Sequence, residues 1–566
     1  MTVSSATSSA STASTSGSSS TITTTGTTNS SSIDWSALIQ SEVNAKLASA
    51  TSIQTTITAN EAKIAAYQKL QTQLSTLSTG LSSLSTSIIN SLATNVYSTR
   101  AATITSTGDV SASSSVDMSI GNGAATGDHT LQISQLATAQ KVIGSAQSSQ
   151  STALGYTGSF SLGLSGGSSA TISVTSGMTL QDVVDAVNAQ TSTTNVQASI
   201  VQVSSGQYEM VLSGTQDAAD IVTSSVSGTD VLNSLGVTNS SGAFTDVLQK
   251  SQPALLTLDG ISLSRNTNDI TDVLSGVTFN LLQATPTGTT LNISISTDTS
   301  QIQTALQTFV TNYNAFRDDV VSQGTQNTDG TASSTAVLFG DGTMRDIMTQ
   351  LQQALSTSLN GMSMSDLGLS FNSTNELVLD TSALASTMSS NLSGLTGLLA
   401  VQTTTSTSEL SVINTAAAPP ASFTLDVAVD SSGNLTASVG GDSSMFSVSG
   451  TSIIGQAGTP YAGMAFNYTG TTSQSITVTS TTGIAAQIYN IAKTVSDTNS
   501  GSLQDLINNL QDQDTTLQQK VSDIQEQAST YQTNLQNQYA QYQAAIETAN
   551  NTLNYLSALL KQSSSN

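Results

Sequence analysis

The sequence predicts an α+β protein in which long terminal helices form a coiled-coil stalk, or leg, with β-rich head domains inserted between them. Three observations lead to this fold class. The C-terminal run from Leu503 to Leu560 spaces its apolar residues three and four apart, with neither Pro nor Gly from Ser502 to Asn566. A shorter run from Ile53 to Ile88 has similar spacing. Between the two runs, segments that alternate apolar and polar residues are separated by Gly-containing turns, as in β-sheets.

The C-terminal seam is the longest apolar stripe of the chain. At about 1.5 Å per residue its helix would be roughly 85 Å long, which is longer than a globular domain needs. A narrow stripe on so long a helix requires a partner. We interpret these residues as a seam for coiled-coil pairing, oligomerisation or docking: Leu517, Val521, Ile524, Leu535, Tyr542, Ile546, Leu553, Leu556 and Leu560.

The N-terminal seam is the expected partner. Its step from Tyr67 to Leu70 is three residues where four were due, a stammer that should overwind the coil locally. Asn60 lies on the seam and is expected to fix the register by pairing with a polar partner such as Asp514. The alternative is that each seam is one face of a helix buried in a bundle. The N-terminal seam residues are Ile53, Ile57, Ile64, Leu74, Leu77, Leu81, Leu84 and Ile88.

Composition narrows the function classes. The chain has 566 residues, of which only 8% are charged, and a net charge of −24. Without basic patches, nucleic acid and anionic membranes are poor partners. The absence of cysteine excludes thiolate catalysis and zinc sites with sulfur ligands. No run reaches about 18 apolar residues, so membrane insertion is not expected. The first 32 residues lack the pattern of a signal peptide, which predicts an intracellular protein or one exported without a cleaved signal.

The chain divides by composition into several regions. Residues 1–32 are mainly Ser, Thr, Ala and Gly and are expected to be disordered, because they cannot bury enough apolar surface. The region 401–421 is rich in Thr and Ser, ends in two prolines and is interpreted as a linker. The other predicted regions are a helical segment (33–95), a β-rich head (96–298) with a nested domain at about 141–249, a helical leg (299–400), a third β-rich region (422–482) and a C-terminal helical segment (483–566).

Two helix starts carry recognisable caps. Asp34 or Ser36 is expected to cap the first helix, where Trp35 is interpreted as a hydrophobic staple rather than a binding anchor. Thr179 followed by Asp182 predicts a capping box at the start of a short amphipathic helix.

Catalytic motifs are weak, and we expect no enzyme, catalytic residue, cofactor or metal site. Gly163 to Gly167 matches the nucleophile-elbow pattern around Ser165, but no histidine follows it, so a hairpin turn is the better interpretation. The segments 340–342 and 440–442 resemble fragments of calcium loops, yet neither continues with ligands at the required spacing.

Several segments, in order along the chain, resemble the flagellar hook-associated protein 2 family. They include residues 127–141 with the letters QLATAQK, the Leu258-Asp259-Gly260 turn with the block that follows it, FVTNYNA at 309–315, and GDGTMR at 340–345. The matches extend over most of residues 33–560, and the central β region matches least.

The resemblance implies a protein that caps the distal end of the bacterial flagellar filament and promotes flagellin insertion and polymerisation. The implied partners are further copies of the chain in a cap ring, flagellin, hook–filament junction proteins, and the flagellar export apparatus with its chaperone. It also implies secretion to the filament tip. The alternatives are a junction or other axial protein of the flagellum and, from another class, a surface adhesin.

Overall fold

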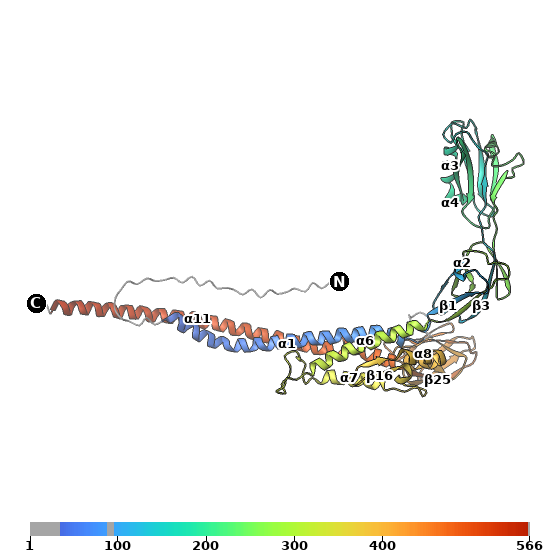
Figure 1. The fold of residues 1–566 in the computed structure, drawn as a ribbon. Coiled ribbons are helices and arrows are strands. Elements are labelled where there is room, and N and C mark those ends of the chain that lie inside the picture. The colour runs from blue at the N-terminus through green and yellow to red at the C-terminus, as the bar shows by residue number, and fades with distance from the viewer. Residues whose placement is uncertain (1–33, 88–94, 564–566) are drawn as a thin grey trace. The chain divides into compact units, whose positions relative to one another are not determined.

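The computed structural model describes residues 34–87 and 95–563, and the predicted disorder of residues 1–32 and the seam position Ile88 lie outside these ranges. The chain separates into two compact units, residues 1–64 with 508–566, and residues 65–507. Two long helices contribute to both units: α1 (Trp35–Ser85) and α11 (Ser502–Ser563) (Figure 1).

Helix α1 begins where the sequence predicts. The Asp34 carboxylate accepts a hydrogen bond from the backbone N–H of Ala37 at 3.0 Å and one from the Ser36 hydroxyl at 2.6 Å, so Asp34 is the cap. Trp35 is therefore the first helical residue. The staple interpretation is wrong, because a staple requires the apolar residue to precede the cap.

The first β domain in the unit 65–507 contains two sheets that pack around a shared core. The five-stranded sheet has the order β1-β15-β3-β11-β12 and the three-stranded sheet β13-β14-β2. Alternating residues such as Leu131, Ile133 and Phe279 fill the core. The elements are β1 (Arg100–Ser106), α2 (Ala112–Ser115), β2 (Val116–Ile120), β3 (Gly127–Gln135), β11 (Ala254–Leu258), β12 (Ile261–Arg265), β13 (Asp269–Leu274), β14 (Val277–Leu281) and β15 (Leu291–Thr297).

A second β domain lies between β3 and β11 in the sequence and has a core of its own around Phe160 and Leu212. Its sheets have the orders β10-β4-β8-β7 and β6-β5-β9. The predicted capping box is confirmed at α3, where Thr179 and Asp182 bond reciprocally. The elements are β4 (Lys141–Ile143), β5 (Gly158–Leu164), β6 (Ser169–Val174), α3 (Leu180–Asn188), α4 (Thr191–Thr194), β7 (Val196–Ser204), β8 (Gln207–Gly214), β9 (Ile221–Gly228), α5 (Val231–Ser234) and β10 (Asp246–Gln249).

Helices return after β15. The segment contains α6 (Thr299–Gln323), α7 (Gly342–Leu355), the 3₁₀ turn η1 (Met364–Leu367), the β16–β17 hairpin (Leu369–Phe371 and Leu377–Leu379), α8 (Thr381–Ser390), α9 (Leu392–Leu399) and, beyond the third β domain, α10 (Ile484–Ser496). The buried side of α6 carries Ile302, Leu306, Phe309, Tyr313 and Phe316, which recur at helical spacing.

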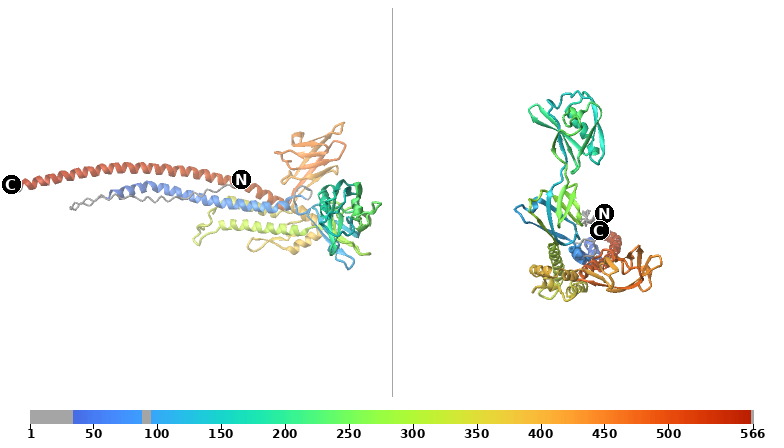
Figure 2. Two further views of the ribbon diagram at one scale, coloured as in Figure 1. Left: turned by 90° about the horizontal axis from the view of Figure 1, so that it is seen from above. Right: turned by 90° about the vertical axis from the view of Figure 1, so that its right-hand side faces the viewer.

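The third β domain begins earlier than the sequence indicated. Residues 401–421 contain two strands, so the linker prediction is wrong. Val401 pairs with Thr482 and Leu410 with Tyr468, partners that lie far along the chain. Figure 2 shows this domain in orange. Its strands are β18 (Val401–Thr405), β19 (Leu410–Asn414), β20 (Ser422–Val429), β21 (Leu435–Ser438), β22 (Phe446–Ser449), β23 (Ser452–Gly455), β24 (Ala465–Tyr468) and β25 (Gln474–Thr482), with the 3₁₀ turn η2 (Ser443–Met445).

Each β domain begins and ends on paired strands. Arg100 lies opposite Thr297 in the first domain, Lys141 opposite Gln249 in the second, and Val401 opposite Thr482 in the third. The chain therefore enters and leaves each domain at the same edge, on antiparallel neighbours.

Candidate assembly interface on the terminal helices

In the unit formed by residues 1–64 and 508–566, α1 and α11 pair in antiparallel fashion. Three contacts show this direction: Trp35 with Tyr539, Glu42 with Tyr531, and Asn60 with Asp514. The residue numbers rise along α1 while those of the partners fall along α11. Their buried apolar core comprises Ile39, Val43, Ala528 and Leu535. The paired seam therefore begins at Ile39, upstream of the predicted start at Ile53, because Ile39 and Val43 continue the three-four spacing.

Asn60 and Asp514 form the polar contact that the heptad phase predicts. The Asn60 amide donates a hydrogen bond to the Asp514 carboxylate at 2.7 Å, and the two residues are only 7% and 6% exposed. A buried polar pair on an apolar seam is satisfied in one alignment only, because a shift of either helix leaves both groups without their partner. This contact therefore fixes the register of the two helices.

The far end of the paired seam is built from aromatic residues. The Trp35 and Tyr539 rings lie 4.9 Å apart, so Trp35 packs across the helix pair. The Tyr531 hydroxyl donates to the Glu42 carboxylate, and this bond raises the pKa of Tyr531. The Lys46 ammonium lies 5.3 Å from the centre of the Tyr531 ring, a cation–π distance. These contacts anchor the first turns of α1 on α11.

The sequence-predicted seam residues of this unit differ in burial. Ile57 and Leu535 are buried, whereas Ile53, Ile64, Leu517, Val521 and Ile524 are half-buried. Beyond Tyr539 the prediction of pairing with the N-terminal helix is wrong, because α1 begins at Trp35, opposite Tyr539. Tyr542, Ile546, Leu553, Leu556 and Leu560 are all exposed, Leu553 by 60% and Leu560 by 69%.

We call this exposed continuation, Tyr542 to Leu560, the distal stripe. Residues 541–563 of α11 are exposed throughout, and Glu547 and Lys561 are the only charged residues among them. The stripe keeps the seam's spacing of three and four, so it retains the geometry of a coiled-coil surface. Among the described residues, none outside α11 packs on it.

In the unit 65–507, the N-terminal seam is buried in a helical bundle. Leu74, Leu77, Leu81 and Leu84 are at most 1% exposed. Helix α6 approaches so closely that a Cβ on Gly80 would lie 2.9 Å from the Asn312 amide nitrogen. From Leu74 to Leu84 the seam is therefore one face of a helix buried in a bundle, which is the alternative to coiled-coil pairing. Tyr67 and Leu70 are both buried, and the overwinding expected at this stammer stays a prediction.

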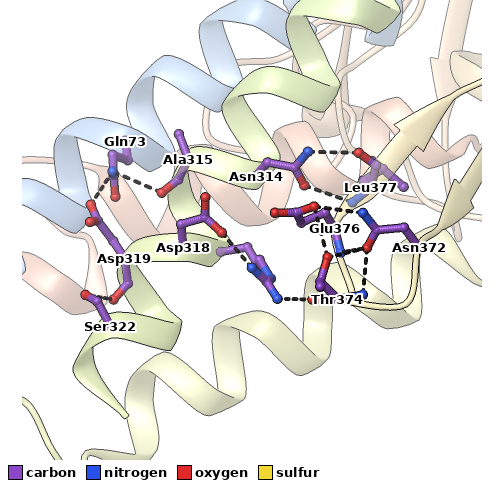
Figure 3. A network of polar contacts seen from close by, with 11 residues as sticks. Gln73, Asn314, Ala315, Asp318, Asp319, Ser322, Asn372, Thr374, Glu376 and Leu377 are labelled. Atoms are coloured by element: carbon purple, nitrogen blue, oxygen red, sulfur yellow. Dashed lines mark hydrogen bonds and ion pairs between the residues drawn. The ribbon is translucent and has the colours of Figure 1, made fainter. Parts of the chain in front are cut away.

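Polar contacts hold α1 and the β16–β17 hairpin on α6 (Figure 3). Asp319 on α6 binds Lys69 at 2.7 Å and accepts a hydrogen bond from Gln73. On the hairpin side, the Asn314 amide donates to the Leu377 carbonyl at 2.8 Å and accepts from the Leu377 N–H at 2.9 Å. The Asn314 amide thus pairs with the backbone C=O and N–H of Leu377 on the hairpin edge, as a neighbouring strand would.

The weak catalytic motifs have structural roles. Ser165 lies in the turn between β5 and β6, where Gly166 has a positive φ of 77°. Asp341 caps α7 by accepting from the Thr343 N–H at 2.7 Å, and Asp442 caps η2. Within residues 34–87 and 95–563, no three carboxylate or imidazole groups gather as a metal site would require. In the same ranges no helix combines the length and apolar character needed to cross a membrane.

The β domains held between long paired helices, together with the lack of a catalytic or metal-binding cluster among the described residues, fit the class of structural proteins. Three family models match the chain: flagellar hook-associated protein 2 N-terminus over residues 31–140, flagellin hook IN motif over 159–216, and flagellar hook-associated protein 2 C-terminus over 251–551. The last alone covers more than half of the chain. The protein therefore belongs to the flagellar hook-associated protein 2 family, the structural family of flagellar filament caps.

Curated relatives agree with this assignment. Flagellar hook-associated protein 2 of Escherichia coli K12 is 29% identical over 386 residues, which cover 65% of this chain and 78% of the relative. The A-type protein of Pseudomonas aeruginosa is 28% identical over 255 residues, 41% of this chain and 52% of the relative.

Two solved structures of proteins named FliD are also similar to the chain. A crystal structure of three domains of the flagellar cap protein of Escherichia coli matches with 25% identity and a TM-score of 0.45, covering 59% of this chain and 90% of that one. The corresponding protein of Pseudomonas aeruginosa PAO1 matches with 23% identity and a TM-score of 0.32, covering 38% and 99%.

Proposed function

We propose that this chain caps the distal end of a bacterial flagellar filament as a homo-oligomer and promotes the insertion and polymerisation of flagellin there. Family membership supports the cap role. The distal stripe carries the proposal from the structure, since it offers a helical apolar surface that no described part of its own chain covers.

The distal stripe is the proposed docking surface for partner helices. Tyr542, Ile546, Leu553, Leu556 and Leu560 lie at seam positions, and a coiled-coil surface buries such residues against another helix. The proposed partners are further copies of the chain and flagellin. Residues 1–33 contain only Val3, Ile22 and Ile33 as large aliphatic residues besides Met1, too few to cover five seam positions.

Export and position complete the proposal. The chain travels to the filament tip through the flagellar export apparatus with the help of its chaperone, and the hook–filament junction proteins are further partners. The lack of cysteine supports this route, since no disulfide has to be opened before passage.

Immunogold labelling of the protein in its own cell tests the location. Label at the distal filament tip is the expected result. Label where the filament leaves the hook would indicate a junction protein instead, and label over the cell body would indicate an adhesin. Either result would contradict the proposed position.

A pair of charge variants tests the stripe. Leu553→Asp with Leu556→Asp places two charges on seam positions, whereas Asn551→Asp with Asn554→Asp places two charges on exposed positions beside them. Both proteins should keep the wild-type circular dichroism spectrum, because the side chains of residues 541–563 are exposed in the single chain. Only the first should lose self-association in sedimentation velocity and filament growth in cells. Equal assembly by both proteins would show that the stripe does not dock.

A further inference from the structure

The first β domain, which contains β1 and α2 in Figure 1, is open along one side. Strand β1 is an edge of the five-stranded sheet and β2 an edge of the three-stranded sheet, and the two strands are not hydrogen bonded to each other. A cleft of about 400 Å³ lies between them. Its walls include Ala102 and Ile104 of β1 and Met118 and Ile120 of β2.

The walls of this cleft belong to the hydrophobic core of the domain. Ile104, Met118 and Ile120 pack against that core, yet each is only half-buried. Leu131 and Ile293, on the inner strands of the same core, are at most 1% exposed. The cleft is therefore a place where apolar core side chains remain open to solvent.

The other ends of the same two sheets, β12 and β13, are joined by side chains. The Arg265 guanidinium donates to the Asp272 carboxylate at 2.9 Å and links β12 to β13. Beside it, the Asn268 amide donates to the Ala137 carbonyl at 2.9 Å and accepts from the Ala137 N–H at 2.8 Å. Only the side between β1 and β2 has a cleft with two edge strands as its walls.

The backbone of β1 directs hydrogen-bonding groups into the cleft. Thr99 and Thr107, which flank β1, bond through their backbones to the residues that flank β15. Backbone groups alternate along an antiparallel strand, so Ala102 and Ile104 direct their N–H and C=O groups to the opposite edge. That edge borders the cleft.

The backbone of β2 does the same from the other wall. Ser115 and Gly121 flank β2 and bond to the residues that flank β14, so Met118 and Ile120 direct their backbone groups away from β14. The Met118 N–H donates to the carboxylate of the exposed Asp117 at 3.0 Å, which shows that an acceptor can reach it there. Within residues 34–87 and 95–563, no strand pairs with the outer edge of β1 or β2.

Neither strand carries a β-bulge, because the β1–β15 and β2–β14 registers run without a shift from end to end. Arg100 is the one charged residue of β1. Its guanidinium is held by backbone carbonyls, donating to Ala124 at 2.7 Å and to Tyr97 at 2.9 Å. Asp117 is the one charged residue of β2. The apolar walls between these two residues carry no charge.

We propose that this cleft binds a short segment of unfolded polypeptide in an extended conformation, with apolar residues at alternate positions. An extended segment has backbone groups on both sides and can bond to both walls, whereas an edge strand of a folded sheet has only one free side. Side chains that face the core meet Ile104 and Met118 and must be apolar, while the alternate ones face solvent. Strand β2 has five residues, which sets the length of the bound segment.

The inference goes beyond the proposed function, since it requires neither a homo-oligomer nor a filament. It adds a capacity to hold polypeptide that has not folded.

Binding of a labelled peptide to the full chain tests the proposal. The probe is fluorescein-labelled Ser-Val-Thr-Val-Thr-Val-Ser, and the control peptide has the same residues in blocks, Ser-Val-Val-Val-Thr-Thr-Ser. Fluorescence anisotropy should show saturable binding of the alternating peptide and at least tenfold weaker binding of the control. Hydrogen exchange should locate the peptide, because the amides of residues 100–106 and 116–120 should exchange more slowly when it is bound. Amides of the second β domain should not change.

Three variants test the walls. Ile104→Lys places a charge on the cleft wall and should weaken binding at least tenfold. Thr103→Lys is the matched control, because Thr103 is exposed on the other face of the same strand, and it should bind as the wild type does. Asp117→Ala should strengthen binding about threefold, because the carboxylate no longer competes for the Met118 N–H. Circular dichroism confirms that each variant is folded.

Several results would overturn the proposal: no saturable binding, equal binding of the two peptides, or no protection of the β1 and β2 amides. Equal binding by folded Ile104→Lys and Thr103→Lys would do so as well. If Ile104→Lys does not fold, weaker or unchanged binding by Asp117→Ala decides against the cleft. Binding only after deletion of residues 2–28 would mean that the chain's own N-terminal segment is the occupant, which also contradicts the proposal. None of these results affects the proposed cap role, which is tested in the cell.

Discussion

Replacement of Asn60 by alanine is the most direct test of how the terminal helices are aligned. The Asp514 carboxylate, 6% exposed, loses the amide that binds it at 2.7 Å. A hydrogen bond to a charged group contributes about 1.5–3 kcal/mol. The better helix propensity of alanine returns about 0.6 kcal/mol. The helix pair should therefore lose about 1–2.4 kcal/mol of stability.

Hydrogen exchange read by mass spectrometry measures this loss in the relevant unit. About 1.4 kcal/mol corresponds to a factor of ten, so amides of residues 35–64 and 508–540 should exchange roughly five- to fiftyfold faster. Asn551→Ala is the matched control, since it also replaces asparagine by alanine, at a position that is exposed on α11. Equal exchange in the two variants would refute the buried-pair reasoning.

A double replacement separates stability from register. Asn60→Leu with Asp514→Leu removes both polar groups and leaves an apolar seam, which should protect the amides at least as well as the native pair. If the amides of the double variant exchange faster than those of Asn60→Ala, the Asn60–Asp514 pair stabilises the helices beyond avoiding an unpaired buried group.

Three further predictions concern other contacts. Leu535→Ala should destabilise the helix pair by about 2–4 kcal/mol, because Leu535 is buried. Leu553→Ala should change its stability by less than about 0.5 kcal/mol, because Leu553 is exposed. Equal losses of amide protection in the two variants, measured by hydrogen exchange, would contradict the described end of the paired seam. The His129 side chain and the Thr130 N–H hold the pKa of Asp259 below its usual range. The resulting stability is present above the unfolded-state pKa of about 3.9 and lost as the pH falls through the lower folded pKa, so Asp259→Asn should flatten the acid limb of thermal stability below about pH 4. Thr179→Ala should cost about 1 kcal/mol in the second β domain, and unchanged exchange of the α3 amides would contradict its role as a cap.

Local periodicity and cap chemistry were sufficient to predict several contacts. The heptad phase placed Asn60 and Asp514 on facing seams, and the Thr179 capping box follows from four residues. Such features depend on neighbours in the sequence or on a regular repeat, and both are visible without a structure.

The missed features depend on partners far along the chain. Residues 401–414 are rich in Thr and Ser and become strands because they pair with residues 465–482. Local composition carries no sign of that pairing. The distal stripe has the same spacing as the paired seam, and only the start of α1 at Trp35 shows which part is covered. The edge strands β1 and β2 likewise appear only once the sheet order is known.

The paired first and last strands of the β domains make each domain exchangeable. In the third domain, Val401 lies beside Thr482, so α9 and α10 would need only a short loop to be joined directly. A domain whose ends are neighbours can lengthen, shrink or be replaced during evolution without moving the helices that carry it. An engineer can therefore graft a foreign module between the same two residues, Val401 and Thr482.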